Sequence, residues 1–300
     1  MDLSIKIGKT TLPNPVGAAS GTFGYGTEYS KLTDTESIGA IYTKALTPLP
    51  KEGNPCPRLV ETPSGLLNSI GLANIGVERF IKEKLPLIKD LPGCIIPNIA
   101  GSTKEDYIKV IQRLEEEAGV DGYEINLSCP NVSKGALAFG TDPDVIEDMV
   151  KSLRRLTLRP IIIKLTPNVT DISIPAKAAE NAGADAVSCI NTLKGMAIDV
   201  NAKRPVLPKG IAGLSGPAVK PVGIAMVYTV SKSISIPVIG VGGITDTSDA
   251  LEYLLAGASG VQVGTSNFID PRTCTEIVKG ISRYCDKEGI ECIKDFHSYL

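Results

Sequence analysis

The sequence predicts a (β/α)8 barrel formed by a single domain over residues 1–300. Eight short apolar segments alternate with stretches of helical periodicity. Several of these segments are apolar at consecutive positions, as in Ile161-Ile162-Ile163, which is typical of parallel strands covered on both faces. Polar residues or glycines follow the segments at the same end. A doubly wound sheet shares this alternation and is the alternative architecture.

The predicted strands are near-continuous apolar runs, and they cover residues 16–19, 40–44, 95–99, 122–127, 161–165, 186–190, 238–241 and 260–263. The predicted helices place apolar residues three and four positions apart, and they cover residues 104–118, 145–153, 172–182, 221–231, 248–255 and 273–284. Asp142-Pro143-Asp144 is a typical helix start, and Gly183 is a typical helix end.

Two long segments, 47–75 and 193–221, interrupt the alternation and are rich in Pro and Gly. They follow the second and sixth predicted strands, at the carboxyl end where barrel enzymes place their active sites. Loops of this length usually carry function, so we expect both to act as lids over a site.

Composition excludes several classes of function. The formal net charge is −2 with no basic run, which argues against binding nucleic acid. The first residues lack a signal-peptide pattern, and no apolar stretch is long enough to span a bilayer, so we expect a cytoplasmic protein without a membrane segment. The seven cysteines include no Cys-x-x-Cys pair, which favours a reducing compartment and argues against a metal or iron–sulfur site on this chain. His297 is the only histidine, so a general base must be a Cys, Lys, Tyr or carboxylate.

The strand ends carry the candidate site. Lys44 and Lys164 follow apolar runs, where an ammonium group needs an anion to offset its desolvation. Further hydrogen-bonding groups follow the other strands, namely Ser20, Asn98, Asn126, Asn191 and Thr192. Gly242-Gly243 and Gly264-Thr265 follow the last two strands, where barrels commonly bind phosphate through bare backbone N–H groups.

Cys129 lies just beyond its strand, between Ser128 and Pro130, and is a candidate proton acceptor or nucleophile. A buried cysteine is more often an inert apolar residue, which is the role we predict for Cys94 and Cys189 inside their strands. Together the strand ends suit a phosphorylated cofactor and a small anionic substrate, with a lysine near the ring if the cofactor is a flavin. A barrel that binds a phosphate ligand without catalysis is the alternative, and the yellow colour of a flavoprotein would exclude it.

Five motifs in this order resemble the dihydroorotate dehydrogenase family over residues 13–269. They are Asn68-Ser69-Ile70-Gly71-Leu72, Asn126-Leu127-Ser128-Cys129-Pro130-Asn131, Asn191-Thr192-Leu193, Gly213-Leu214-Ser215-Gly216-Pro217 and Val241-Gly242-Gly243-Ile244. The resemblance implies an FMN barrel that oxidises dihydroorotate to orotate in pyrimidine biosynthesis, with Cys129 as the base that removes the C5 proton. The membrane-bound class has Ser at this position and an N-terminal membrane segment, so Cys129 places the chain with the cytosolic class.

The resemblance also assigns ligand-binding positions. Those for the substrate are Lys44, Asn68, Ser69, Ile70, Gly71, Leu72, Asn126, Asn191 and Thr192. Those for FMN are Ser20, Lys44, Ala45, Asn98, Asn126, Lys164, Ile190, Gly216, Gly242, Gly243, Gly264 and Thr265.

Asn191-Thr192-Leu193 followed by Gly195-Met196-Ala197-Ile198-Asp199 is similar to class 1B of the family. This class passes electrons to NAD through a partner subunit that carries FAD and a [2Fe–2S] cluster, in a heterotetramer built on a homodimer. The fumarate-reducing class 1A is the alternative. Ser133-Lys134-Gly135-Ala136 departs from the family pattern, which has a second Gly there, and this affects the predicted shape of the loop after Cys129.

Overall fold

The computed structural model describes residues 1–127 and 139–298, and its centre is a ring of parallel strands. In chain order the ring contains β3 (Val16–Ala18), β4 (Ala40–Tyr42), β7 (Cys94–Ile96) with β8 (Asn98–Ile99), β9 (Tyr123–Asn126), β10 (Ile161–Leu165), β11 (Ala186–Cys189), β16 (Val238–Val241) and β17 (Gly260–Val263). The strand order is β7-β4-β3-β17-β16-β11-β10-β9-β8.

The ring closes because β7 and β8 are two parts of one extended segment, separated by Pro97. β7 pairs with β4 on one side, and β8 pairs with β9 on the other. The N–H of Glu124 donates to the carbonyl of Pro97 at 3.0 Å, so the pairing runs across the interruption. The barrel prediction is therefore confirmed, and the doubly wound alternative is wrong.

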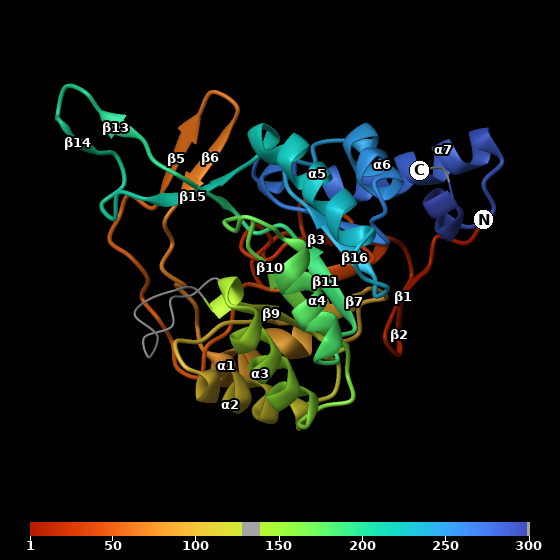
Figure 1. Cartoon of the computed structure of the whole chain (residues 1–300), viewed down its shortest axis with the longest axis horizontal. Helices are drawn as coiled ribbons and strands as arrows, with labels where there is room; N and C mark the ends of the chain where they lie inside the picture. The colour runs from red at the N-terminus through yellow and green to blue at the C-terminus, as the bar shows by residue number, and fades with distance from the viewer. Residues whose placement is uncertain (128–138, 299–300) are drawn as a thin grey trace.

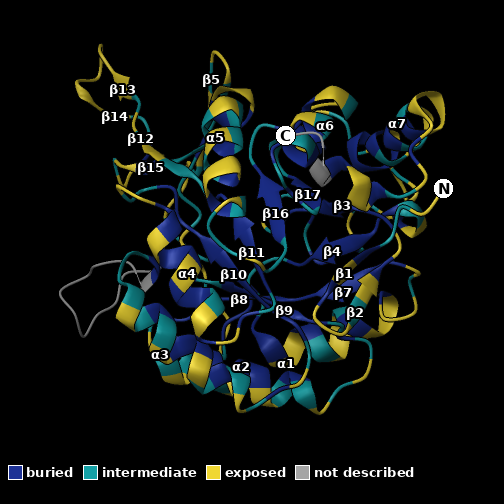
Figure 2. Cartoon of the chain, turned by 45° about the vertical axis from the view of Figure 1, so that its right-hand side comes forward, coloured by how far each residue is buried: buried dark blue, intermediate teal, exposed yellow. Residues whose placement is uncertain are grey.

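Six helices cover the outside of the ring (Figure 1): α2 (Lys104–Glu115), α3 (Pro143–Arg154), α4 (Ser173–Asn181), α5 (Lys220–Ser231), α6 (Thr247–Leu255) and α7 (Thr273–Glu288). All six were expected, and their starts follow from local chemistry. Thr103 forms a capping box with Asp106 at α2, and the Asp142 carboxylate accepts from two N–H groups at α3. Figure 2 shows that the helices expose their outer faces and bury the inner ones against the strands. A short turn, α1 (Val77–Arg79), continues into irregular helix up to Leu87 and was not predicted.

The two long segments each contribute two strands to an antiparallel sheet, which the sequence did not predict. The sheet contains β5 (Leu59–Thr62), β6 (Gly65–Asn68), β12 (Leu193–Gly195) and β15 (Ala212–Ser215), in the order β12-β15-β6-β5. A small hairpin, β13 (Ile198–Asp199) with β14 (Arg204–Pro205), extends from it. We call residues 59–68 and 193–215 the arm, because they project from the barrel (Figure 1). A separate apolar cluster of Leu67, Leu207 and Ala212 holds the arm together.

An N-terminal hairpin, β1 (Ile5–Ile7) with β2 (Thr10–Leu12), lies at the amino ends of the strands. It was not predicted. Ile5, Ile7 and Leu12 are buried in the main core, and the Thr10 hydroxyl donates to the carbonyl of Asp121, just before β9. Within the described part of the chain, no helix combines the length and apolar character needed to cross a membrane.

Candidate active site at the carboxyl ends of the barrel strands

The structure brings several predicted residues together from distant parts of the chain. The Lys164 ammonium at the end of β10 lies 3.3 Å from the Ser20 hydroxyl, beyond β3. The Asn191 amide, beyond β11, donates to the Asn126 amide oxygen of β9 at 3.2 Å. Ile190 and Asn191 continue the strand pairing through their N–H groups, which donate to Val241 and Leu165. The carboxyl ends of the strands thus form one polar mouth.

A buried carboxylate lies beneath this mouth. Glu124 on β9 is fully buried and accepts four hydrogen bonds inside the barrel. The donors are Asn98 Nδ2 (2.6 Å), Lys164 Nζ (3.2 Å), Ser188 Oγ (2.8 Å) and Gln262 Nε2 (2.8 Å). Sequence reasoning did not single out Glu124, Ser188 or Gln262. A charged residue in the middle of a strand predicted to be buried was the signal that could have identified Glu124.

The environment of Glu124 also corrects the argument made for Lys164. The expected anion near this lysine is supplied by the protein itself, because Lys164 and Glu124 form an ion pair with 6% and 0% of their side chains exposed. Burial raises the pKa of Glu124, but the positive charge of Lys164 and the hydrogen bonds from Gln262, Asn98 and Ser188 outweigh it, so the pKa lies below its ordinary value. The Glu124 carboxylate is therefore ionised at neutral pH.

Two other polar groups in the mouth have no such partner in the described part of the chain. Asn98 Oδ1 is buried without a hydrogen bond among the described residues. Lys44 is partly buried, and burial followed by the nearby charge of Arg58 lowers its pKa, with Glu28 acting in the opposite direction. The backbone N–H of Lys44 donates to the carbonyl of Gly24, and Ala45 is the next residue of the chain. A buried acceptor and a desolvated cation are groups that an anionic, hydrogen-bonding ligand would satisfy.

The predicted substrate segment 68–72 meets the arm at the edge of the mouth. Asn68 Nδ2 donates to the carbonyl of Gly213 at 3.1 Å. A side chain at Gly213 would collide with Thr192 Oγ1, so Asn68 and Thr192 both lie against this glycine. Asn54 holds the segment through two hydrogen bonds. Its side-chain amide donates to the Ser69 hydroxyl at 3.0 Å, and its backbone N–H donates to the carbonyl of Ile70 at 2.9 Å.

The same segment contains unusual backbone. Leu72 has a φ of 57° and follows Gly71 at 71°. A left-handed conformation at a bulky residue costs free energy and is often found at ligand sites. The segment's shape is therefore imposed by its surroundings rather than by local preference.

Backbone glycines form a cradle where the chain leaves β15, β16 and β17. A Cβ added to Gly243 would lie 2.8 Å from the carbonyl oxygen of Gly216 and from the N–H nitrogen of Lys220, and Gly243 has a φ of 69°. Gly242 has a φ of 133°. The Thr265 hydroxyl, directly after Gly264, donates to the hydroxyl of Ser215 at 2.9 Å. The cradle thus joins the connections that follow β15, β16 and β17. Ser215 belongs to one of the family motifs but was not among the predicted ligand-binding residues.

Comparisons with known proteins identify the family. The dihydroorotate dehydrogenase family model matches residues 2–284. The chain belongs to this family. It is 52% identical over 294 residues to the "Dihydroorotate dehydrogenase B (NAD(+)), catalytic subunit" of Geotalea daltonii, covering 98% of this chain and 96% of the relative. The protein of the same name from Thermoanaerobacter sp. (strain X514) is 50% identical over 295 residues, covering 98% and 97%.

The fold agrees with a solved dihydroorotate dehydrogenase. The crystal structure of the Eimeria tenella enzyme in complex with ferulenol superposes with a TM-score of 0.79, at 22% identity, over 98% of this chain and 87% of that one. At this identity the likeness concerns the barrel fold alone.

Cys129, the base predicted from the family motif, lies outside the described residues. The strand leading to it is described as far as Leu127, which is buried. Cys94 and Cys189 are buried in their strands as expected. Burial raises the pKa of Cys94 to about 12 and raises the pKa of Cys189 further, so neither thiol is ionised at neutral pH.

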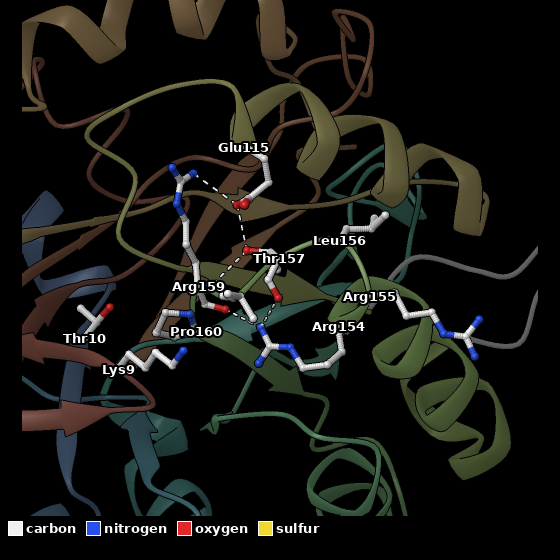
Figure 3. Close-up of a pocket in the computed structure, with 10 residues that line it drawn as sticks. Lys9, Thr10, Glu115, Arg154, Arg155, Leu156, Thr157, Arg159 and Pro160 are labelled. Carbon is white, nitrogen blue, oxygen red and sulfur yellow. Dashed lines mark hydrogen bonds and ion pairs between the residues drawn. The ribbon is translucent and has the colours of Figure 1, made fainter.

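The hollow of about 430 Å³ in Figure 3 lies at the other end of the barrel and is not this site. Two of its arginines, Arg154 and Arg159, bind protein groups. Arg159 donates to the carbonyls of Leu114 and Glu117, and Arg154 pairs with Asp185 at 2.6 Å. Arg154 Nε has no partner among the described residues, but its other nitrogens donate to Thr157 and Arg159. We assign these side chains to holding the ends of helices and strands.

Proposed function

We propose that this chain is the catalytic subunit of an NAD-linked dihydroorotate dehydrogenase, which oxidises (S)-dihydroorotate to orotate. The observation that carries the proposal is identity of about 50% to catalytic subunits of that name over nearly the whole chain. The polar mouth, which contains residues predicted from the family motifs, supports it. The single domain over residues 1–300 holds all the proposed ligand positions.

FMN is the proposed cofactor, and the mouth has groups that fit it. The backbone cradle of Gly216, Gly242, Gly243, Gly264 and Thr265 suits a phosphate, because N–H groups can approach it where no side chain intervenes. Asn98 Oδ1 suits an N–H donor of the ring. Ser20, Lys44, Ala45, Asn126, Lys164 and Ile190 would line the remainder of the ring site. Bound FMN would supply the acceptor for the hydride.

The remaining residues would bind substrate and handle its proton. Lys44 and the amides of Asn68, Asn126 and Asn191 suit the carboxylate and ring amides of dihydroorotate, with Ser69 to Leu72 and Thr192 closing around them. Cys129 would accept the C5 proton as thiolate while the C6 hydride leaves, so that the substrate loses two electrons and two hydrogens. Water would be excluded by the arm and by segment 68–72.

A partner subunit would pass the electrons on to NAD. We propose a partner with FAD and a [2Fe–2S] cluster, in a cytoplasmic heterotetramer built on a homodimer of this chain. The arm supports a protein contact, because Met196, Ile198, Val200 and Ile211 expose 48–81% of their surface there. The hairpin of β13 and β14 is drawn as exposed in Figure 2. Such side chains are usually covered when a protein assembles.

The decisive experiment is to purify the chain alone and with its partner, and to assay both with dihydroorotate. We expect a yellow protein, with NAD reduction by the complex and none by the isolated chain. Reduction of fumarate by the isolated chain would favour the class 1A alternative. A colourless protein that binds phosphate ligands without turnover would favour the non-catalytic barrel.

A further inference from the structure

The buried carboxylate of Glu124 divides its hydrogen bonds between two sides. Oε1 accepts from Ser188 on β11 and Gln262 on β17, at 2.8 Å each. Oε2 accepts from Asn98 at 2.6 Å and Lys164 at 3.2 Å. The first pair has no proposed role toward a ligand, whereas both members of the second pair belong to the proposed FMN site. One side therefore anchors the carboxylate, and the other side connects it to the flavin site.

The contact with Asn98 determines which atom of that amide is available. Because Asn98 Nδ2 donates to Glu124, the amide cannot rotate without placing its own oxygen against the carboxylate. Oδ1 is consequently fixed as the free acceptor, and it is buried without a partner among the described residues. A neutral or absent group at position 124 would release this constraint.

The contact with Lys164 determines the charge beside the ring. The Glu124 carboxylate and the Lys164 ammonium sum to zero, and both are buried. Removing the carboxylate leaves one uncompensated positive charge in a region of low dielectric, where charges act strongly over several ångströms. A positive charge near the flavin favours its reduced form, which carries more negative charge than the oxidised form.

We propose that Glu124 is a positioning residue that orients Asn98 and Lys164 toward the flavin and thereby sets its reduction potential. This inference rests on the proposed function, since it requires FMN in the mouth. Glu124 itself does not contact the ligand in this arrangement. It acts through the two side chains that Oε2 holds.

The test measures the midpoint potential and the FMN dissociation constant of the complete complex carrying Glu124→Gln or Glu124→Asp. For Glu124→Gln we expect a more positive potential, by at least a tenfold change in the equilibrium constant for reduction, about 30 mV for two electrons. FMN binding should weaken about tenfold, because Asn98 loses its fixed orientation. Glu124→Asp keeps the charge, so the potential should move less while FMN binding still weakens.

Asp185→Asn is the matched control, because it also removes the acid of a partly buried ion pair, but at the far end of the barrel. It should lower the unfolding temperature without changing the potential or FMN affinity. Glu124 variants that retain FMN with the wild-type potential and affinity would reject this inference. If neither Glu124 variant folds, Ser188→Ala decides, since it removes one anchor and no charge: weaker FMN binding supports the inference, and unchanged binding rejects it. A wild-type protein without FMN would instead reject the proposed function.

Discussion

The two ends of the barrel use polar side chains in different ways. At the amino end, Asp185 accepts from Arg154 and from the N–H of Ile161, where β10 begins. The carboxylate of Asp121 likewise accepts a hydrogen bond from the N–H of Ile95, at the start of β7. These groups complete the protein's own hydrogen bonding.

At the carboxyl end, Lys44 and Asn98 Oδ1 are desolvated without such partners among the described residues. The difference teaches that burial alone does not mark a site. A ligand is indicated where unsatisfied polar groups from separate strands meet at one mouth, whereas, among the described residues, Arg154 Nε at the amino end is a single unsatisfied atom of a side chain otherwise held by protein groups.

Cys129→Ala should lower turnover by 10²- to 10⁴-fold, on the order expected for loss of a general base. The measurement is steady-state oxidation of dihydroorotate by the complex. Cys292→Ala is the control, because this thiol lies far along the chain at the C-terminal segment and has no proposed role. Orotate affinity should change little in either variant. Near-wild-type turnover of Cys129→Ala would remove it from the proposed reaction.

Lys44→Ala should weaken orotate binding by about 10- to 100-fold, the loss expected for a charge-assisted hydrogen bond. Lys194→Ala is the control, since Lys194 on β12 is an exposed residue of the arm. Binding can be followed by the change in flavin absorbance on titration.

The pH dependence of binding sharpens this prediction. The pKa of Lys44 lies below the ordinary 10.5, because burial and then the charge of Arg58 disfavour the ammonium form. Wild-type affinity for the anion should therefore fall as pH rises through this lowered pKa, at a lower pH than for an ordinary lysine. The Lys44→Ala protein should lack this fall. An identical alkaline profile in both proteins would contradict the role of Lys44.

Gly243→Ala should weaken FMN binding by roughly tenfold, because the added Cβ would displace the carbonyl of Gly216 or the start of α5. Gly289→Ala is a close control. It has the same φ of 69°, yet a Cβ there would meet nothing within 4 Å. Both variants carry the same backbone strain, so only the difference between them reports the cradle. Equal FMN affinity would show that the cradle does not bind the phosphate.

The sequence was informative wherever a pattern is local. The strands of the ring and the six helices followed from runs and periodicities within single segments, and the mouth residues followed from their positions after those strands. The arm could not be predicted in this way. Its central pairing joins Leu67 to Leu214, and its strands are only two to four residues long.

The partners of Glu124 required the same kind of long-range knowledge. They come from β8, β10, β11 and β17, and only the strand order and register place them around one carboxylate. The argument from desolvation correctly indicated that Lys164 needed an anion. It could not show whether that anion is a bound ligand or a side chain of the protein. In the structure it is the Glu124 carboxylate.

Asp185→Asn should leave both ligands bound as in the wild type, and its effect should appear in stability alone. The change removes the charge opposite Arg154 and weakens the acceptor for Ile161, so the free energy of unfolding should fall by about 2 kcal/mol, between the values for exposed and buried pairs. Urea unfolding of the FMN-loaded protein measures this, with Asp270→Asn as a control for an exposed pair with Arg272. Loss of orotate or FMN affinity in Asp185→Asn, measured where the protein is fully folded, would mean that the two ends of the barrel are coupled and that the distinction between them does not hold.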